Sequence, residues 1–233
     1  MSRTLTVHLG VSMVLGLVLI VSVSAHSKST QTGGLKAEDL IAQLRQFPAA
    51  LPGIAPSNGV PDPAERKRRS VYDQLWKLGN AALPALNHGL ADPDVQTRRN
   101  VALFLNAAAG NWYEPTRPRL DIRGCLTVLI GALADSDGRV RELAAQAIGA
   151  IGSAAAPAVP ALIGLLASAD EGSRNSACIG LTGIGPTARK ALPALRKALF
   201  DPSADVRRFA QRAIDAIEGS ITPSNKRMEP SRF

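Results

Sequence analysis

Apolar residues recur three, four and seven positions apart in several stretches of the chain, which is the spacing of one buried face of an α-helix. One such stretch is "RELAAQAIGAI", where the apolar stripe is Ala144, Ala147, Ile148 and Ile151. A similar stripe follows each of five arginines, the last three of which are 33 residues apart. These arginines are Arg68, Arg98, Arg141, Arg174 and Arg207. The return of one pattern at a fixed spacing indicates a repeated structural unit.

An acidic residue or a serine stands six positions before each of these arginines. The five positions hold Asp62, Asp92, Asp135, Ser168 and Asp201. Aspartate is favoured as a helix N-cap because its side chain accepts an orphan backbone N–H, and the proline that follows three of the four aspartates is favoured at the first helical position. We therefore expect these acids to cap the long helices, with Glu65 completing a capping box with Asp62.

A shorter apolar helix precedes each long one. In the second unit its stripe is Leu83, Leu86 and Leu90. Proline stands near the start of three short helices, and glycine ends the long helix before them. The prolines are Pro84, Pro160 and Pro193, and the glycines are Gly79, Gly152 and Gly185. A lone helix pair cannot bury both of its faces, so neighbouring pairs must stack. The sequence therefore predicts an all-α fold, an α-solenoid that is a superhelical stack of about five helix pairs.

The segment "IGPTARKALPALRKALFDPSADVRRFAQRAIDAIEG" resembles HEAT repeats, and in particular the short variant of the phycobilisome chromophore lyases. The resemblance covers Pro61 to Gly219, and a degenerate helix, "LKAEDLIAQLRQF", precedes it. It implies an α-solenoid that contacts other proteins through the face of its second helices or through inserted loops. It also leaves open a chromophore-lyase-like subunit, because the motif is specific for fold and weak for function.

The first 25 residues resemble a secretory signal peptide, with Arg3, an apolar run over residues 11–23 and Val23-Ser24-Ala25 before a cleavage site. We interpret residues 26–34 as a flexible linker, 35–219 as the solenoid and 220–233 as a disordered tail. The expected location is the periplasm or the exterior of the cell. The alternative is an uncleaved N-terminal segment that anchors the domain outside the membrane, although the run is short for a full span.

The residues beyond the signal segment offer few groups for catalysis. Their only histidines are His26 and His88, and Cys125 and Cys178 have no neighbouring Cys or His at metal-ligand spacing. We expect no cofactor, no metal and no enzymatic activity. The two cysteines fall in different helices at non-equivalent positions, which favours buried thiols over a disulfide.

The net charge of +8 could attract an acidic polymer or surface. Four arginines outside the repeat frame are candidate contacts for a partner: Arg117, Arg119, Arg123 and Arg139. The arginines of the frame could grip an acidic ligand, but we favour a structural role in which each crosses to an acid of the next unit. Export makes nucleic acid a less favoured partner.

The stretch "NWYEPTRPRL" breaks the period and contains Trp112 and Tyr113, residue types favoured at interfaces. It is a candidate contact loop or, equally, an apolar lid over the seam that the insertion leaves in the stack. A monomer is expected, although the terminal unit from Phe200 to Ile217 could pair with another copy. The sequence thus predicts a non-enzymatic protein–protein interaction scaffold of the cell envelope or exterior. The alternatives are a lyase-like subunit and a solenoid that binds anions or nucleic acid.

Overall fold

The computed structural model describes residues 36–47, 63–110 and 119–219. These residues form ten α-helices and four short 3-10 helices. The α-helices are α1 (Ala37–Leu44), α2 (Pro63–Leu78), α3 (Leu83–Leu90), α4 (Val95–Gly110), α5 (Leu126–Ala132), α6 (Gly138–Ile151), α7 (Val159–Leu165), α8 (Glu171–Ile184), α9 (Leu192–Ala198) and α10 (Ala204–Glu218). The 3-10 helices are η1 (Gly79–Ala82), η2 (Ile122–Cys125), η3 (Gly152–Ala158) and η4 (Gly185–Ala191).

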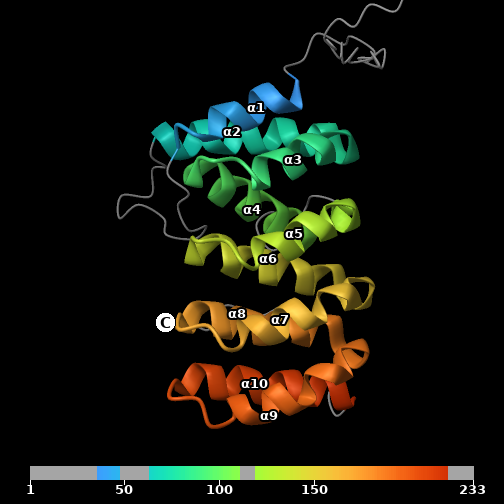
Figure 1. Cartoon of the computed structure of the whole chain (residues 1–233). Coiled ribbons are helices and arrows are strands. Elements are labelled where there is room, and N and C mark those ends of the chain that lie inside the picture. The colour runs from blue at the N-terminus through green and yellow to red at the C-terminus, as the bar shows by residue number, and fades with distance from the viewer. Residues whose placement is uncertain (1–35, 48–62, 111–118, 220–233) are drawn as a thin grey trace, which may run out of the picture. The chain divides into compact units, whose positions relative to one another are not determined.

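The helices stack in layers within one compact unit that begins at Leu35 (Figure 1). Each layer is a pair made of a short helix and the long helix that follows it, from α1 with α2 to α9 with α10. The long helices α4, α6, α8 and α10 make the most extensive contacts with one another, whereas successive short helices touch little. The prediction of an α-solenoid of helix pairs is therefore confirmed.

Glycine and proline occupy the predicted places in the links between pairs. The glycines that end α2, α6, α8 and α10 have positive φ angles, which other residues rarely adopt. They are Gly79 (54°), Gly152 (79°), Gly185 (67°) and Gly219 (80°). Prolines stand in the first turn of α3, α7 and α9, where the missing backbone N–H costs no hydrogen bond.

The core changes in character along the stack. In the N-terminal pairs the ring of Phe104 makes edge contacts with Tyr72 and Trp76, each at a centroid distance of 5.3 Å. Further along, α6 and α8 approach almost to backbone contact, and a Cβ built on Gly149 would lie 3.0 Å from the Cα of Gly180. Small side chains thus set the closest helix spacing in the molecule's second half.

The prediction that the frame acids are the N-caps was wrong. The caps stand two residues later: Asp137 accepts the N–H of Val140, and Asp170 and Ser203 act alike in α8 and α10. Asp94 accepts the N–H of Thr97 in the same way at the start of α4.

The frame acids instead close a turn before the helix. The Oδ1 atoms of Asp92, Asp135 and Asp201 accept the backbone N–H two residues on, at 2.7, 2.8 and 2.9 Å. The physical reason is that an aspartate side chain closes a local turn as readily as it caps a helix, and a following proline fits either position. Asp62 lies outside the described residues, so its capping box with Glu65 stays a prediction.

Residues 138–165 are long and apolar enough to cross a membrane by length and composition. They do not form one continuous α-helix, because α6 ends at Ile151 and Gly152 turns the chain into η3 before α7. Within the residues that the structure describes, this stretch is two stacked helices of the solenoid.

Several predictions fall on residues outside the described ranges. They concern the signal peptide, the linker over 26–34, most of the insertion after α4, and the tail over 220–233. These remain predictions.

Candidate functional site

Arginines of the repeat frame hold the turn of their own pair through one nitrogen. The Nη1 atom of Arg98 donates to the carbonyls of Asp92 and Pro93 at 2.9 and 3.0 Å. Arg141 and Arg174 repeat this arrangement with the carbonyls six and five residues before them. Two hydrogen bonds donated by one nitrogen fix the plane of the guanidinium group, so its remaining nitrogens point toward the next pair.

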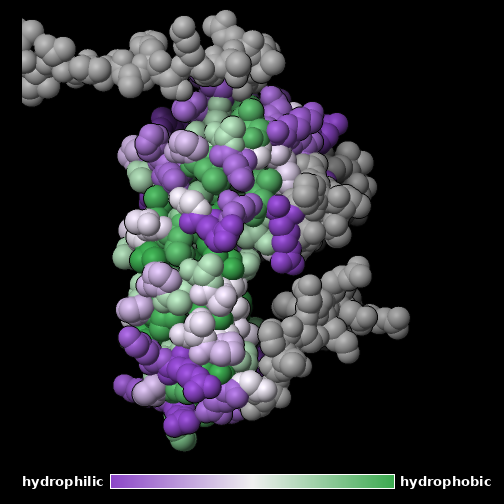
Figure 2. All heavy atoms as spheres, turned by 90° about the vertical axis from the view of Figure 1, so that its right-hand side faces the viewer, coloured by the Kyte–Doolittle hydropathy of each residue, from purple (hydrophilic) through white to green (hydrophobic). Residues whose placement is uncertain are grey.

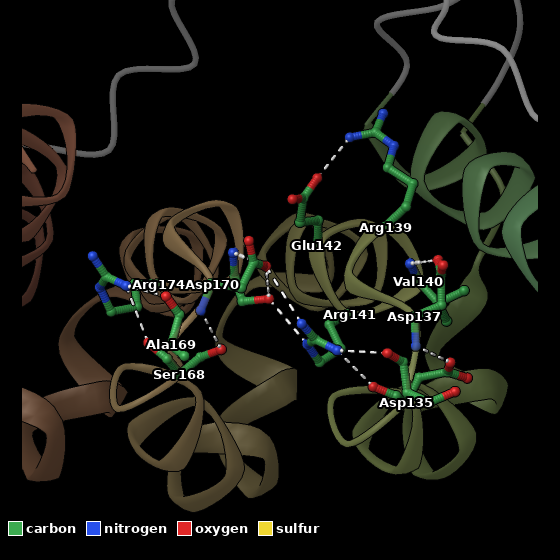
Figure 3. Close-up of polar contacts among 12 residues, drawn as sticks. Asp135, Asp137, Arg139, Val140, Arg141, Glu142, Ser168, Ala169, Asp170 and Arg174 are labelled. Atoms are coloured by element: carbon green, nitrogen blue, oxygen red, sulfur yellow. Dashed lines mark hydrogen bonds and ion pairs between the residues drawn. The ribbon is translucent and has the colours of Figure 1, made fainter.

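The same arginines then cross to the next pair. Arg98 donates from Nε and Nη2 to Asp135 at 2.7 and 3.0 Å, and Arg174 does so to Asp201 at 2.8 and 2.9 Å. Arg141 reaches Asp170, at 3.4 Å, and the hydroxyl of Ser173 (Figure 3). The hydrogen bond from Arg174 holds the pKa of Asp201 below its usual value. These arginines tie adjacent pairs together, and their carboxylate partners belong to the protein itself.

This series of arginine–carboxylate pairs departs from the expected pattern at its two ends. Asp92 receives Arg45 at 3.1 Å from the segment after α1, whereas the frame predicted Arg68. Arg68 is buried and pairs with Glu65 of its own helix. The degenerate first pair places its cation after α1 rather than in α2, which explains the exchange. At the other end, Arg207 has no following pair among the described helices.

The candidate arginines outside the frame do not form one surface. Arg123 pairs with Asp121 at 2.6 Å, and Arg139 pairs with Glu142 at 2.9 Å. Arg119 and Arg123 line a shallow hollow of about 400 Å³ beside the C-terminal end of α6. Arg139 stands in the first turn of α6, about 18 Å away along a helix that rises 1.5 Å per residue.

The remaining candidates Trp112, Tyr113 and Arg117 lie outside the described residues. Their part in partner binding stays a prediction.

One surface, which lies along the long helices, was not predicted from the sequence. A Cβ on Gly180 would lie 3.1 Å from Leu162, so this side of α8 faces α7. Residues 175, 179 and 182 lie on the opposite side of the same helix. Most positions equivalent to these in α6 and α10 are also half-buried or exposed, and the exception is Gly149 of α6, which is buried. We call this set the long-helix stripe: Glu142 and Gln146 of α6, Asn175, Ile179 and Thr182 of α8, and Arg208, Arg212 and Asp215 of α10.

Some polar atoms in the long-helix stripe have hydrogen-bond partners within the protein and others do not. Gln146 accepts a hydrogen bond from Asn106 at 2.9 Å and donates one to Ser176 at 3.3 Å. The hydroxyl of Thr182 donates to the carbonyl of Cys178 at 2.8 Å. The Oδ1 atom of Asn175 is buried and has no hydrogen-bond partner among the described residues. A buried acceptor left unpaired is costly.

The described residues contain no group of three His, Cys, Asp or Glu that could hold a metal. His88 is exposed, as expected from its place on the polar side of α3. Cys125 and Cys178 are buried and not bonded to each other. Burial raises the pKa of these thiols to about 11 and about 12. A thiol that stays protonated at neutral pH is a poor nucleophile and a poor metal ligand.

Stacked helix pairs with this connectivity define the class of α-solenoid repeat proteins. The family model of the HEAT repeat matches residues 125–155, which run from the end of η2 through α6 into η3. This match covers one helix pair, α5 with α6. No curated protein sequence matches the chain.

Solved structures with the same architecture include natural and designed repeat proteins. The complex of CpcE and CpcF of phycocyanin lyase from Nostoc sp. PCC7120 is 22% identical, with a TM-score of 0.55 over 76% of this chain and 97% of that chain. A designed armadillo repeat protein in complex with the peptide (KR)4 is 20% identical, with a TM-score of 0.51 over 76% and 72%. An engineered protein is 22% identical, with a TM-score of 0.53 over 78% and 89%. These likenesses show the fold, and a HEAT or armadillo-like fold suggests a scaffold for protein interactions.

Proposed function

We propose that the protein is a non-enzymatic scaffold that binds another protein along the long-helix stripe. The observation that carries the proposal is the row of exposed and half-buried side chains at equivalent positions of α6, α8 and α10, with Asn175 and Ile179 at its centre. The flanking charges, Glu142 and Arg208, are engaged by Arg139 and Asp205 within their own helices. The centre of the stripe is therefore uncharged, with paired charges on both sides.

An extended polypeptide fits this arrangement. Stacked helices lie about 8–10 Å apart, and an extended chain advances about 3.3 Å per residue. Equivalent positions on successive helices thus match about every third residue of a bound segment. The exposed part of Ile179 would contact an apolar side chain of such a segment. The designed armadillo protein named above, whose solved complex contains a peptide, supports this mode of binding for the fold.

We further propose that the protein acts outside the cytoplasm, in the cell envelope or beyond it. The support is the apolar run over residues 11–23 after Arg3, which has the pattern of a secretory signal. A lyase-like role and binding of anions or nucleic acid are the alternatives. Binding to nucleic acid would weaken steeply with salt because phosphate contacts release counterions.

The test is affinity capture with the full chain after mild crosslinking, using a matched pair of variants. Thr182→Arg places a bulky charge in the long-helix stripe. Thr127→Arg places the same charge on the exposed side of the short helix α5. We expect one partner to be captured by the wild type and by Thr127→Arg but lost with Thr182→Arg, while circular dichroism shows equal helicity in all three.

Equal loss of the partner with both variants would contradict the proposed surface. A mixture of polyanions that elutes with moderate salt would contradict the proposed partner class.

A further inference from the structure

We propose that the corner formed by Arg207 and Phe200, at the last described helix pair, is a preformed site for an acidic side chain of a partner polypeptide. This inference rests on the proposed function only in taking the ligand to be a protein. It concerns a surface separate from the long-helix stripe, on the face of α10 that points away from α8.

Arg207 has half of the arrangement seen at the internal arginines. Its Nη1 atom donates to the carbonyls of Asp201 and Pro202 at 2.7 and 2.8 Å. The corresponding atom of Arg174 makes the equivalent bonds to Ser168 and Ala169. The guanidinium group of Arg207 is therefore held in the same orientation before any ligand arrives.

The other half of the arrangement is open. Nε and Nη2 of Arg98 and Arg174 each bind a carboxylate of the next pair, and these arginine side chains are only 14% and 15% exposed. Nε and Nη2 of Arg207 have no acceptor among the described residues, and the residue is exposed. The protein thus shows, at two internal copies, which ligand this fork takes: a carboxylate held by two parallel hydrogen bonds.

Phe200 supplies a second feature that the internal turns lack. The equivalent positions in the three preceding pairs hold Ala91, Ala134 and Ala167. Phe200 is 88% exposed and immediately precedes Asp201, whose carbonyl holds Arg207. An exposed aromatic residue next in sequence to the turn that orients the guanidinium group suits an acidic residue that has an apolar neighbour in sequence.

The outer face of this terminal pair is more polar than the corresponding face of the pair before it. Cys178 of α8 and Gly185, which follows α8, are buried. Their equivalents in α10 are Gln211 and Glu218, both exposed. On the side shown in Figure 2, hydrophilic residues also gather over α9 and α10 at one end of the stack. A polar outer face is that of a capping repeat. Pairing of the terminal unit with another copy stays a hypothesis.

Neighbouring acids do not compete for the site. Asp205 pairs with Arg208 at 2.8 Å, and Glu218 pairs with Arg196 at 3.1 Å. Asp201 is taken by Arg174. The open cation of this corner is therefore available to a carboxylate brought by a partner.

The test uses the capped peptide ALADSDG, which copies residues 132–138 and contains the aspartate that fills the fork of Arg98. The full chain, labelled with nitrogen-15, is titrated with this peptide while the Nε–Hε signal of Arg207 is followed by NMR. We expect a saturable shift of the Arg207 signal with little change at Arg174. The peptide with asparagine in place of that aspartate should bind at least about tenfold more weakly, because a hydrogen-bonded charge pair is lost. The variant Phe200→Ala should also bind the original peptide more weakly.

Two outcomes would overturn the inference. Equal shifts with both peptides would show that the carboxylate is not recognised. Stronger binding of inorganic phosphate at matched ionic strength would show a general anion site. Failure of this inference can be distinguished from failure of the proposed function. If only this inference fails, a partner captured by the long-helix stripe would still be lost with Thr182→Arg and retained with Arg207→Lys.

Discussion

Gly180 offers the sharpest test of the packing between α6 and α8. In an ordinary helix, replacing glycine by alanine stabilises the fold by about 1 kcal/mol. At Gly180 the new Cβ would lie 2.8 Å from the carbonyl oxygen of Ala145 and 3.1 Å from Cδ2 of Leu162. The first of these atoms belongs to the backbone of α6, so relief requires the two helices to separate.

The expected result for Gly180→Ala is a net loss of stability. Overpacking a close-packed site costs about 1–3 kcal/mol, and the gain of about 1 kcal/mol in helix propensity reduces this to a net loss of up to about 2 kcal/mol. The matched control is Gly164→Ala in α7, where a Cβ would meet nothing within 4 Å. There only the propensity effect remains, so this variant should gain about 0.5–1 kcal/mol.

Thermal unfolding followed by far-ultraviolet circular dichroism measures both variants. One kcal/mol corresponds to a change in Tm of about 2–4 °C for a domain of this size. Gly180→Ala should lower Tm and Gly164→Ala should raise it. A rise in Tm for both variants would show that α6 and α8 are further apart than in the structure, and would refute the reasoning.

Three further predictions test other parts of the structure. Leu162→Ala removes a fully buried side chain and should cost about 2–5 kcal/mol, seen as a lower midpoint in urea. Hydrogen bonds from Arg99 and Arg174 lower the pKa values of Asp137 and Asp201 in the folded state. The stability that these bonds contribute is therefore complete above the unfolded-state pKa of 3.8, and it is lost as the pH falls below that pKa. Urea unfolding at pH 3 and pH 6 should show a smaller difference for Asp201→Asn than for the wild type, and an equal difference would count against this pair. The thiols of Cys125 and Cys178, whose pKa values burial raises to about 11 and about 12, should react with a disulfide reagent at pH 8 only after unfolding; rapid labelling of the native protein would contradict their burial.

The helix pairs could be predicted from the sequence because the residues that mark helix ends and buried faces each favour one place in the structure. Pro84 suits only the start of a helix, and Gly152 adopts a backbone conformation that other residues avoid. The apolar stripes fix which face of each helix is buried. These local signals agree with one another in most of the units, so the α-solenoid follows from them.

The turns before the long helices could not be predicted in the same way. Asp135 accepts a backbone N–H in either of two registers, as an N-cap or two residues before one, and the spacing to Arg141 is the same in both. Only the competing aspartate at 137 decides the register, because it takes the cap.

The surface predictions had a different weakness. Arg123 and Arg139 were unusual in the sequence because they lie outside the frame, but in the structure each pairs with a nearby acid. The long-helix stripe lacks a sequence signal because charged residues, amides, a threonine and an isoleucine share it. The unpaired state of Asn175 depends on atoms from neighbouring layers, and no pattern within one repeat reveals it.

The most direct test of a protein-binding scaffold is site-specific photocrosslinking in the source cells. A photoreactive phenylalanine analogue replaces Ile179, in the centre of the long-helix stripe, or Thr127, on the exposed side of α5. We expect irradiation to yield one discrete protein adduct from position 179 and none from position 127. An adduct only from position 127, or none from either site, would contradict the account.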